Sequence, residues 1–177
     1  MSKRLVFFMP LVAIAAMMAL FAFALLTGVN PQEMDSALEG REMPAFRLTD
    51  VNDSQRTLTE ESLDGEPYLM NFWATWCPSC KFEHPYLNSL ASEGVRIIGV
   101  NYKDDRELAV TWLRDYANPY DIDVFDPNGD LGFELGVTGA PETFFVDSSG
   151  IIRHRFQGPI DSALWENKLK AVYDAME

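Results

Sequence analysis

Two cysteines, separated by two residues, stand between an apolar run and a helical pattern. Residues 68–73 are almost all apolar, which is typical of a short strand covered on both faces. From Pro78 to about Ser92 the pattern is helical, and a proline suits the first helical turn. Cys77 and Cys80 therefore lie one turn apart at the start of a helix, where their sulfur atoms can meet. This order indicates an α/β domain with a redox-active disulfide.

The position of Cys77 favours chemistry at its sulfur atom. Free N–H groups and the dipole at a helix N-terminus stabilise an anion and so lower the pKa of a thiol. A thiol with a pKa of about 8.5 is only about 3% ionised at pH 7, whereas a pKa of about 7 leaves it about half ionised. Since the thiolate attacks disulfides, we expect Cys77 to attack a partner protein. Cys80 then attacks Cys77 and releases the reduced partner, without any cofactor beyond the Cys77–Cys80 disulfide.

Other uses of a cysteine pair fit the sequence less well. A structural disulfide that closes so short a loop removes little entropy from the unfolded chain. A zinc site needs more ligands, and His84 and His154 are the only histidines. Covalent haem attachment requires a histidine directly after Cys80, where the chain has Lys81.

The N-terminal part of the chain predicts a membrane anchor. Residues 5–26 form a run of 22 uncharged residues, long enough for a helix to cross a bilayer. Lys3 and Arg4 precede the run, so the positive-inside rule places residues 1–4 in the cytoplasm as a short tip. A cleaved signal peptide is the alternative, but its apolar region usually spans only about 7–15 residues. Both interpretations export the rest of the chain. In a bacterium the exported domain lies in the periplasm, where disulfides form, and the retained anchor makes the chain a single-pass inner-membrane protein.

The exported part divides into a tether, residues 27–42, and a globular domain, residues 43–177. The order of predicted elements, β-α-β-α-β-β-α, implies a central mixed sheet flanked by helices on both faces. We predict strands at 45–48, 56–58, 68–73, 95–100, 143–146 and 151–156, and helices at 78–92, about 104–116 and about 161–176. The predicted core aromatic residues are Trp73, Tyr102, Trp112, Phe125, Phe133 and Trp165, whereas Trp76, next to Cys77, is expected on a rim that touches a partner.

The charge balance limits the kinds of partner. The chain has a net charge of −13, and without Lys3 and Arg4 the remaining 12 basic residues oppose 27 acidic ones, for a net charge of −15. So acidic a surface repels phosphate backbones, which excludes nucleic acid as an expected partner. It attracts basic polypeptides instead.

Two segments carry a resemblance to a known family. Residues 71–80, Asn-Phe-Trp-Ala-Thr-Trp-Cys-Pro-Ser-Cys, resemble the active-site segment of the thioredoxin superfamily. Residues 136–144, Gly-Val-Thr-Gly-Ala-Pro-Glu-Thr-Phe, resemble the Gly-Val-x-Gly-x-x-Glu-Thr-Phe pattern of the cytochrome c biogenesis thioredoxins called CcmG or DsbE. The resemblance covers about residues 43–177. It implies a thioredoxin-like domain that reduces apocytochrome c before haem attachment. Electrons would come from a membrane thiol reductase of the DsbD or CcdA type, and other cytochrome c maturation proteins would be partners.

The resemblance also implies roles for single residues. Pro141 is expected as a cis-proline that faces the cysteines, and it would leave the backbone at Ala140 open to pair with an extended substrate. Trp76 and Pro78 are expected to contact the substrate as well. The alternative for Pro141 is an ordinary turn proline before a strand.

One position departs from the superfamily pattern and changes which side chain is expected to take up the proton of Cys80. Thioredoxins usually have a buried aspartate six residues before the first cysteine, where this chain has Asn71. An amide cannot exchange a proton at neutral pH, so another group must handle the proton of Cys80. Glu83, one turn beyond Cys80, and Glu142, inside the family motif, are the catalytic candidates. The alternative for Glu83 is a solvated position on an exposed helix face.

Three other functions remain open at this point. A broader exported reductase of the TlpA or ResA type would use the same cysteine chemistry on other proteins. A peroxiredoxin expects threonine three residues and proline seven residues before its cysteine, where this chain has Ala74 and Met70. A non-catalytic module that binds apocytochrome would leave the disulfide incidental. The sequence does not determine the direction of electron flow.

Overall fold

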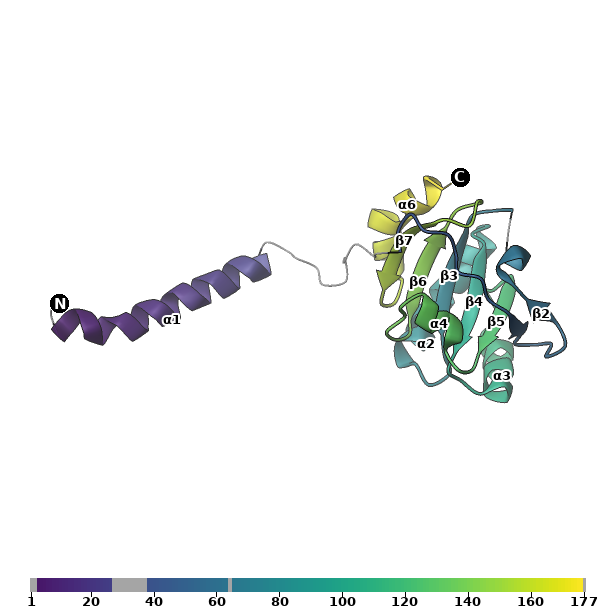
Figure 1. The fold of residues 1–177 in the computed structure, drawn as a ribbon, viewed down its shortest axis with the longest axis horizontal. Coiled ribbons are helices and arrows are strands. Elements are labelled where there is room, and N and C mark those ends of the chain that lie inside the picture. Colours follow the sequence, from purple (N-terminus) through teal and green to yellow (C-terminus); the bar gives the residue numbers. More distant parts are fainter. Residues whose placement is uncertain (1–2, 27–37, 64, 177) are drawn as a thin grey trace. The chain divides into compact units, whose positions relative to one another are not determined.

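The computed structural model describes residues 3–26, 38–63 and 65–176. The chain separates into two compact units, Met1–Met34 and Asp35–Glu177 (Figure 1). The described part of the first unit is a single helix, α1 (Lys3–Leu26), which ends where the predicted anchor ends. Within the described ranges, no helix has the combination of length and hydropathy that a membrane crossing requires. Residues 1–2 of the predicted tip and 27–37 of the predicted tether lie outside the described residues.

The second unit is built around one mixed sheet of seven strands in the order β2-β1-β5-β4-β3-β6-β7 (Figure 1). The strands β3, β4 and β5 are parallel to one another, and the remaining neighbours pair antiparallel. The strands are β1 (Leu48–Asp50), β2 (Thr57–Leu58), β3 (Tyr68–Trp73), β4 (Ile97–Tyr102), β5 (Ile122–Asp126), β6 (Glu142–Val146) and β7 (Ile152–Gln157). The predicted mixed sheet is therefore confirmed.

Helices cover both faces of this sheet, as expected. One face packs against α2 (Pro78–Ser92), α3 (Arg106–Tyr116) and the C-terminal helical segments, and both cysteines belong to this core. The other face packs against α4 (Asp130–Glu134) and the short 3-10 helix η1 (Glu60–Leu63). Figure 1 shows α4 in front of the sheet in that view. The C-terminal segments are α5 (Ser162–Leu164), the π-helix η2 (Trp165–Leu169) and α6 (Lys170–Asp174).

Local chemistry explains the elements that the sequence predicted best. All six residues of β3 are buried, as expected of a central strand covered on both faces. The side chain of Asp105 caps α3, since its carboxylate accepts hydrogen bonds from the backbone N–H groups of Glu107 and Leu108. Helix α2 has the predicted bounds, and Pro78 occupies its first turn.

Several predictions about the fold are wrong in detail. The first strand begins at Leu48 instead of residue 45, and β4 is shifted by two residues. Strand β5 and helix α4 were not predicted, because Asp123 and Asp126 interrupt the apolar pattern of β5 although both are buried. The predicted last helix is interrupted by the π-helical segment. Phe133 is not a core residue: the short helix α4 buries Leu131 and Gly132 and leaves Phe133 81% exposed.

Candidate active site

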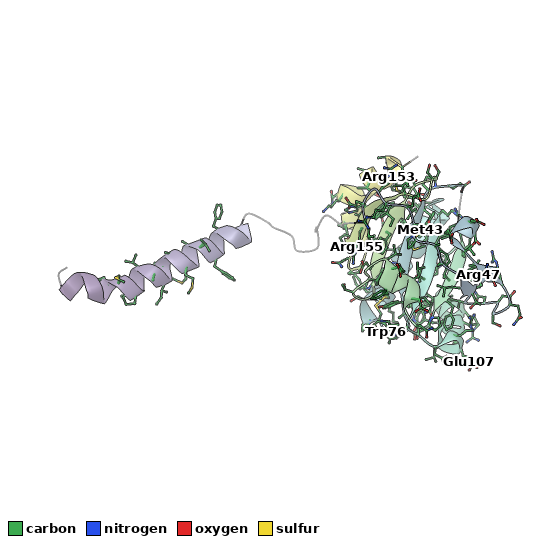
Figure 2. All side chains as sticks on the ribbon, in the orientation of Figure 1. Met43, Arg47, Trp76, Glu107, Arg153 and Arg155 are labelled. Carbon is green, nitrogen blue, oxygen red and sulfur yellow. A yellow bond between two sulfur atoms is a disulfide. The ribbon has the colours of Figure 1, made fainter. Side chains whose placement is uncertain are left out.

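The cysteine pair lies at the carboxyl edge of two parallel strands. Strand β3 ends at Trp73, opposite Asn101 near the end of β4, and the chain then turns through Trp76 into α2. Figure 2 shows Trp76 at the lower end of the globular unit. The loops that follow parallel strands meet at one edge of a sheet, which is where α/β proteins commonly place functional groups.

Cys77 and Cys80 form a disulfide at the start of α2. Cys77 is the N-cap residue, and its Sγ accepts a hydrogen bond of 3.0 Å from the backbone N–H of Cys80. Both cysteines are buried, whereas Trp76 is 53% exposed, as expected of a rim residue. The helix end thus directs a backbone donor at the sulfur that we expect to react first.

Glu83 is buried in the helix that carries the cysteines, which rules out the alternative of a solvated helix face. Its Oε1 accepts from Nδ2 of Asn71 at 3.0 Å, and its Oε2 accepts from the backbone N–H of Ile160 at 2.8 Å. Burial raises the pKa of Glu83 from 4.5 to about 7, and the two hydrogen bonds only partly oppose this effect. A carboxyl group with this pKa can both gain and lose a proton near neutral pH.

Asn71 connects Glu83 to the rest of the buried polar cluster. Its Nδ2 also donates to Oγ1 of Thr143 at 3.0 Å, and its Oδ1 accepts from the hydroxyl of Tyr120 at 3.1 Å. Sequence reasoning found Asn71 and Glu83 but missed Tyr120 and Thr143. Thr143 stands in the family motif, which is a usable signal, whereas Tyr120 lies in the loop between α3 and β5, where no motif marks it.

The structure places Glu142 on the opposite face of the sheet from this cluster. Thr143 opposes Asn71 in the β3–β6 register, and side chains of successive strand residues point to opposite faces. The carboxylate of Glu142 is paired with Nε of Arg155, and it accepts from the backbone N–H of Thr138 at 3.4 Å. Burial is the largest influence on Glu142 and raises its pKa, against the hydrogen bond and charge of Arg155. The structure therefore brings Glu83, but not Glu142, into the cluster with Asn71.

The loop before β6 has the predicted backbone. The Ala140–Pro141 peptide bond is cis, which confirms the expected cis geometry of this proline. Ala140 packs against the hydrophobic core that contains Cys77 and Cys80. The loop and the cysteine helix therefore lie against the same core.

The described residues were expected to show whether the cysteines belong to a metal site. Among residues 3–26, 38–63 and 65–176, no three His, Cys, Asp or Glu side chains are arranged so that they could hold one. His84 is buried and its Nε2 lies 2.7 Å from the carbonyl oxygen of Ala117, so this nitrogen donates to the backbone.

Comparison with known proteins agrees with this geometry. Residues 38–173 match the Redoxin family model. The chain is 46% identical to the thiol:disulfide interchange protein DsbE of Vibrio cholerae, over 99% of this chain and 97% of that protein. It is 47% identical to the protein of the same name in Pseudomonas aeruginosa, over 98% of this chain and 96% of that protein.

Solved structures show the same fold. The thio-disulfide isomerase of Thermus thermophilus has a TM-score of 0.60 at 27% identity and covers 76% of this chain and 96% of its own. The MTB dsbF protein, solved in mixed oxidised and reduced forms, has a TM-score of 0.63 at 25% identity and covers 75% of this chain and 95% of its own. The predicted thioredoxin-like fold is confirmed.

Proposed function

Because this chain belongs to the DsbE family of thiol:disulfide interchange proteins, with Cys77 and Cys80 as its redox site, we propose that it reduces apocytochrome c before haem attachment. The observation that carries the proposal is the hydrogen bond from the N–H of Cys80 to Sγ of Cys77 at the start of α2. This donor stabilises a thiolate at Cys77, which is the form that attacks a disulfide.

The reaction is a two-step exchange. The Cys77 thiolate attacks one sulfur of the substrate disulfide, and the other sulfur leaves as a thiolate that takes up a proton. The Cys80 thiol then loses its proton and attacks Sγ of Cys77, which releases the second substrate sulfur as a thiol. The substrate gains two electrons and two protons, and the chain ends with the Cys77–Cys80 disulfide seen in the structure.

In this scheme Glu83 handles the proton of Cys80. Glu83 lies three residues beyond Cys80 on the same helix, and the pKa of about 7 lets its carboxylate accept a proton at neutral pH. The N–H donors from Asn71 and Ile160 hold both carboxyl oxygens in place. Glu142, paired with Arg155 on the other face, serves instead to hold the loop that carries Pro141.

The substrate binds as an extended segment next to the disulfide. Trp76 supplies an exposed aromatic surface on one side, and the loop through Ala140 and Pro141 supplies backbone on the other. Pro78 completes the apolar surroundings of Cys77. The acidic balance of the chain favours encounter with a basic polypeptide such as apocytochrome c.

The domain acts from the membrane, on the exported side. Residues 5–26 serve as a single-pass inner-membrane anchor with residues 1–4 in the cytoplasm, 27–42 as a tether, and residues 43–177 as the periplasmic thioredoxin-like domain. The support comes from the sequence, in which Lys3 and Arg4 precede 22 uncharged residues. A membrane thiol reductase of the DsbD or CcdA type returns the disulfide to the dithiol, and other cytochrome c maturation proteins act beside it.

Trapping tests the substrate. The full chain carrying Cys80→Ala, reduced and then mixed with oxidised apocytochrome c, should accumulate a mixed disulfide through Cys77. Cys77→Ala is the matched control and should trap nothing. A Cys80→Ala variant that forms no adduct with apocytochrome c, yet forms one with unrelated oxidised proteins, would point to a broader reductase of the TlpA or ResA type. Cytochrome maturation that survives replacement of both cysteines by serine would support the non-catalytic binding module.

Membrane extraction tests the anchor. Alkaline carbonate should leave the full-length chain in the membrane pellet. A soluble chain whose N-terminus lies near or beyond residue 22 would show that the segment is a cleaved signal peptide.

A further inference from the structure

The loop between β4 and α3 forms hydrogen bonds with the residues that precede the first cysteine. Asp104 lies in this loop, 29 positions along the chain from Thr75. Its Oδ2 accepts from the backbone N–H of Thr75 at 2.6 Å, and its Oδ1 accepts from the Thr75 hydroxyl at 2.7 Å. Both carboxylate oxygens therefore bind Thr75, which lies two positions before Cys77.

The same loop also holds the next residue. Nε1 of Trp76 donates to the backbone carbonyl of Lys103 at 3.0 Å, so the orientation of the exposed indole depends on this loop. Lys103 has a φ of 49°, in the left-handed region that non-glycine residues rarely occupy. This uncommon backbone conformation therefore lies where the loop contacts the active-site turn.

The held residues belong to the turn that presents Cys77. The backbone N–H of Cys77 donates to the carbonyl of Ala74 at 3.2 Å, which closes a turn with Thr75 and Trp76 at its centre. Beyond this turn the chain enters α2, whose N-cap is Cys77 itself. The direction of the Cys77 sulfur therefore follows from the turn, and the turn is fastened from outside α2.

We propose that Asp104 is a positioning residue for disulfide exchange, which holds the Thr75–Trp76 turn so that Cys77 and the Trp76 ring meet the substrate in a reactive geometry. The inference rests on the thiol–disulfide exchange of the proposed function, but it does not depend on apocytochrome c as the substrate. It gives a role to a residue that lies outside both family motifs.

A carboxylate is the group this position requires. Besides the two bonds to Thr75, Oδ2 accepts from Nδ2 of Asn101 at 3.0 Å, and Oδ1 accepts from the backbone N–H of Asp105 at 2.9 Å. Every one of these donors faces an oxygen. An asparagine in place of Asp104 sets its NH2 group against the backbone N–H of either Thr75 or Asp105, whichever way the amide is turned. The isosteric change Asp104→Asn thus loosens the turn while preserving its volume.

The test measures the reactivity of Cys77 in the full-length chain, purified in detergent and reduced. The probe is dithiobis-nitrobenzoate, a small disulfide that needs no protein-specific surface. Its first equivalent of nitrothiobenzoate reports the attack of Cys77, and a pH series separates the pKa of the thiol from the limiting rate of its thiolate. The variants are Asp104→Asn, Thr75→Val, Thr75→Ser and the double change Asp104→Asn with Thr75→Val. Glu107→Gln is the charge-matched control, since Glu107 is exposed in the first turn of α3 (Figure 2).

We expect Asp104→Asn to lower the limiting rate of the thiolate about tenfold, which is less than the roughly hundredfold cost of a misplacement of about 1 Å. Thr75→Val should lower it less, because the bond from its backbone N–H remains. Thr75→Ser should keep the wild-type rate, because it keeps both donors. The effects of the two changes should be less than additive in the double variant, because both changes remove the same contact. Its rate should therefore fall below that of Asp104→Asn by less than the full effect of Thr75→Val.

Two results would overturn the proposal. In the first, Asp104→Asn lowers the unfolding temperature but leaves the limiting rate equal to that of Glu107→Gln, so that Asp104 serves stability alone. In the second, the effects of Asp104→Asn and Thr75→Val on the rate are additive. If Asp104→Asn does not fold, the contrast between Thr75→Val and Thr75→Ser decides, and equal rates for these two refute the proposal. A wild-type Cys77 that reacts no faster than an ordinary cysteine would instead count against the proposed function.

Discussion

Replacing Glu83 with glutamine should reverse the order of stability between wild type and variant as the pH rises. In the wild type the carboxyl of Glu83 is buried, and its pKa is raised from 4.5 to about 7. A pKa raised above its unfolded value means that the folded state binds the proton more tightly. The corresponding stability is fully present below about pH 4.5 and is lost as the pH rises through about 7.

The expected size follows from the same values. The interval from 4.5 to about 7, at about 1.36 kcal/mol for each pH unit, corresponds to about 3 kcal/mol of unfolding free energy. Glutamine does not ionise, so the variant does not lose this stability. Its NH2 group, however, must face either Nδ2 of Asn71 or the N–H of Ile160, which costs about 1 kcal/mol at every pH. Glu83→Gln should therefore be less stable than wild type near pH 4.5 and more stable by about 2 kcal/mol near pH 8.

Urea unfolding of the oxidised full-length chain measures this difference. The change in tryptophan fluorescence follows the globular unit, where Trp73, Trp112 and Trp165 are buried. Asp123, whose pKa burial raises from 3.8 to about 7, titrates over much of the same range. Its contribution is common to both proteins, so the difference between wild type and variant at each pH isolates Glu83.

A constant difference between the two proteins from about pH 4.5 to about pH 8 would refute the reasoning. It would mean that Glu83 keeps an ordinary pKa in the folded chain, and the proton transfer assigned to it would lose its physical basis. Glu107→Gln is the control for the loss of an exposed charge and should shift the unfolding free energy by less than about 0.5 kcal/mol at both extremes.

Three further predictions concern the buried carboxyl groups of Glu83 and Glu142. Glu83→Gln should slow the release of the second nitrothiobenzoate, which reports attack by Cys80, about a hundredfold at pH 7. The first release should be nearly unchanged. Equal slowing of both releases would contradict the role assigned to Glu83. Asn71→Asp should place two carboxyl groups about 3 Å apart, so that one keeps its proton above pH 7 and the loss of stability in urea extends to higher pH than in wild type. Arg155→Ala should leave the carboxylate of Glu142 buried without its ion-pair partner, which lowers the unfolding free energy by about 3 kcal/mol near pH 8. The loss should be smaller near pH 5, because protonation removes the buried charge. An equal loss at both pH values in urea unfolding would refute this prediction.

Local sequence patterns were sufficient to predict the secondary structure around the cysteines. Helix α2 begins at the predicted proline, and β3 has the predicted bounds, because proline chemistry and an apolar run act over a few residues. Strand β5 escaped prediction because Asp123 is buried only with the help of amide donors from Asn52 and Asn118. Asn52 is 71 positions away along the chain, so no local pattern contains that contact.

The sequence alone did not decide between the two candidate acids, and the strand register of the folded sheet separates them. Glu83 and Glu142 were both candidates because each stands near a recognised motif, and the position of Glu142 beside Pro141 between apolar segments favoured it. Strand parity separates them: once β6 is paired with β3 so that Thr143 opposes Asn71, Thr143 must point toward α2 and its neighbour Glu142 must point away. That register is a property of the folded sheet, set by the alternation of the apolar residues Phe144 and Phe145 between the two cores. A buried carboxylate on the side away from the cysteines then needs its own partner. Arg155 on β7 is that partner, so the contacts of the motif glutamate are with the loop before β6 and with β7, away from the cluster around Asn71.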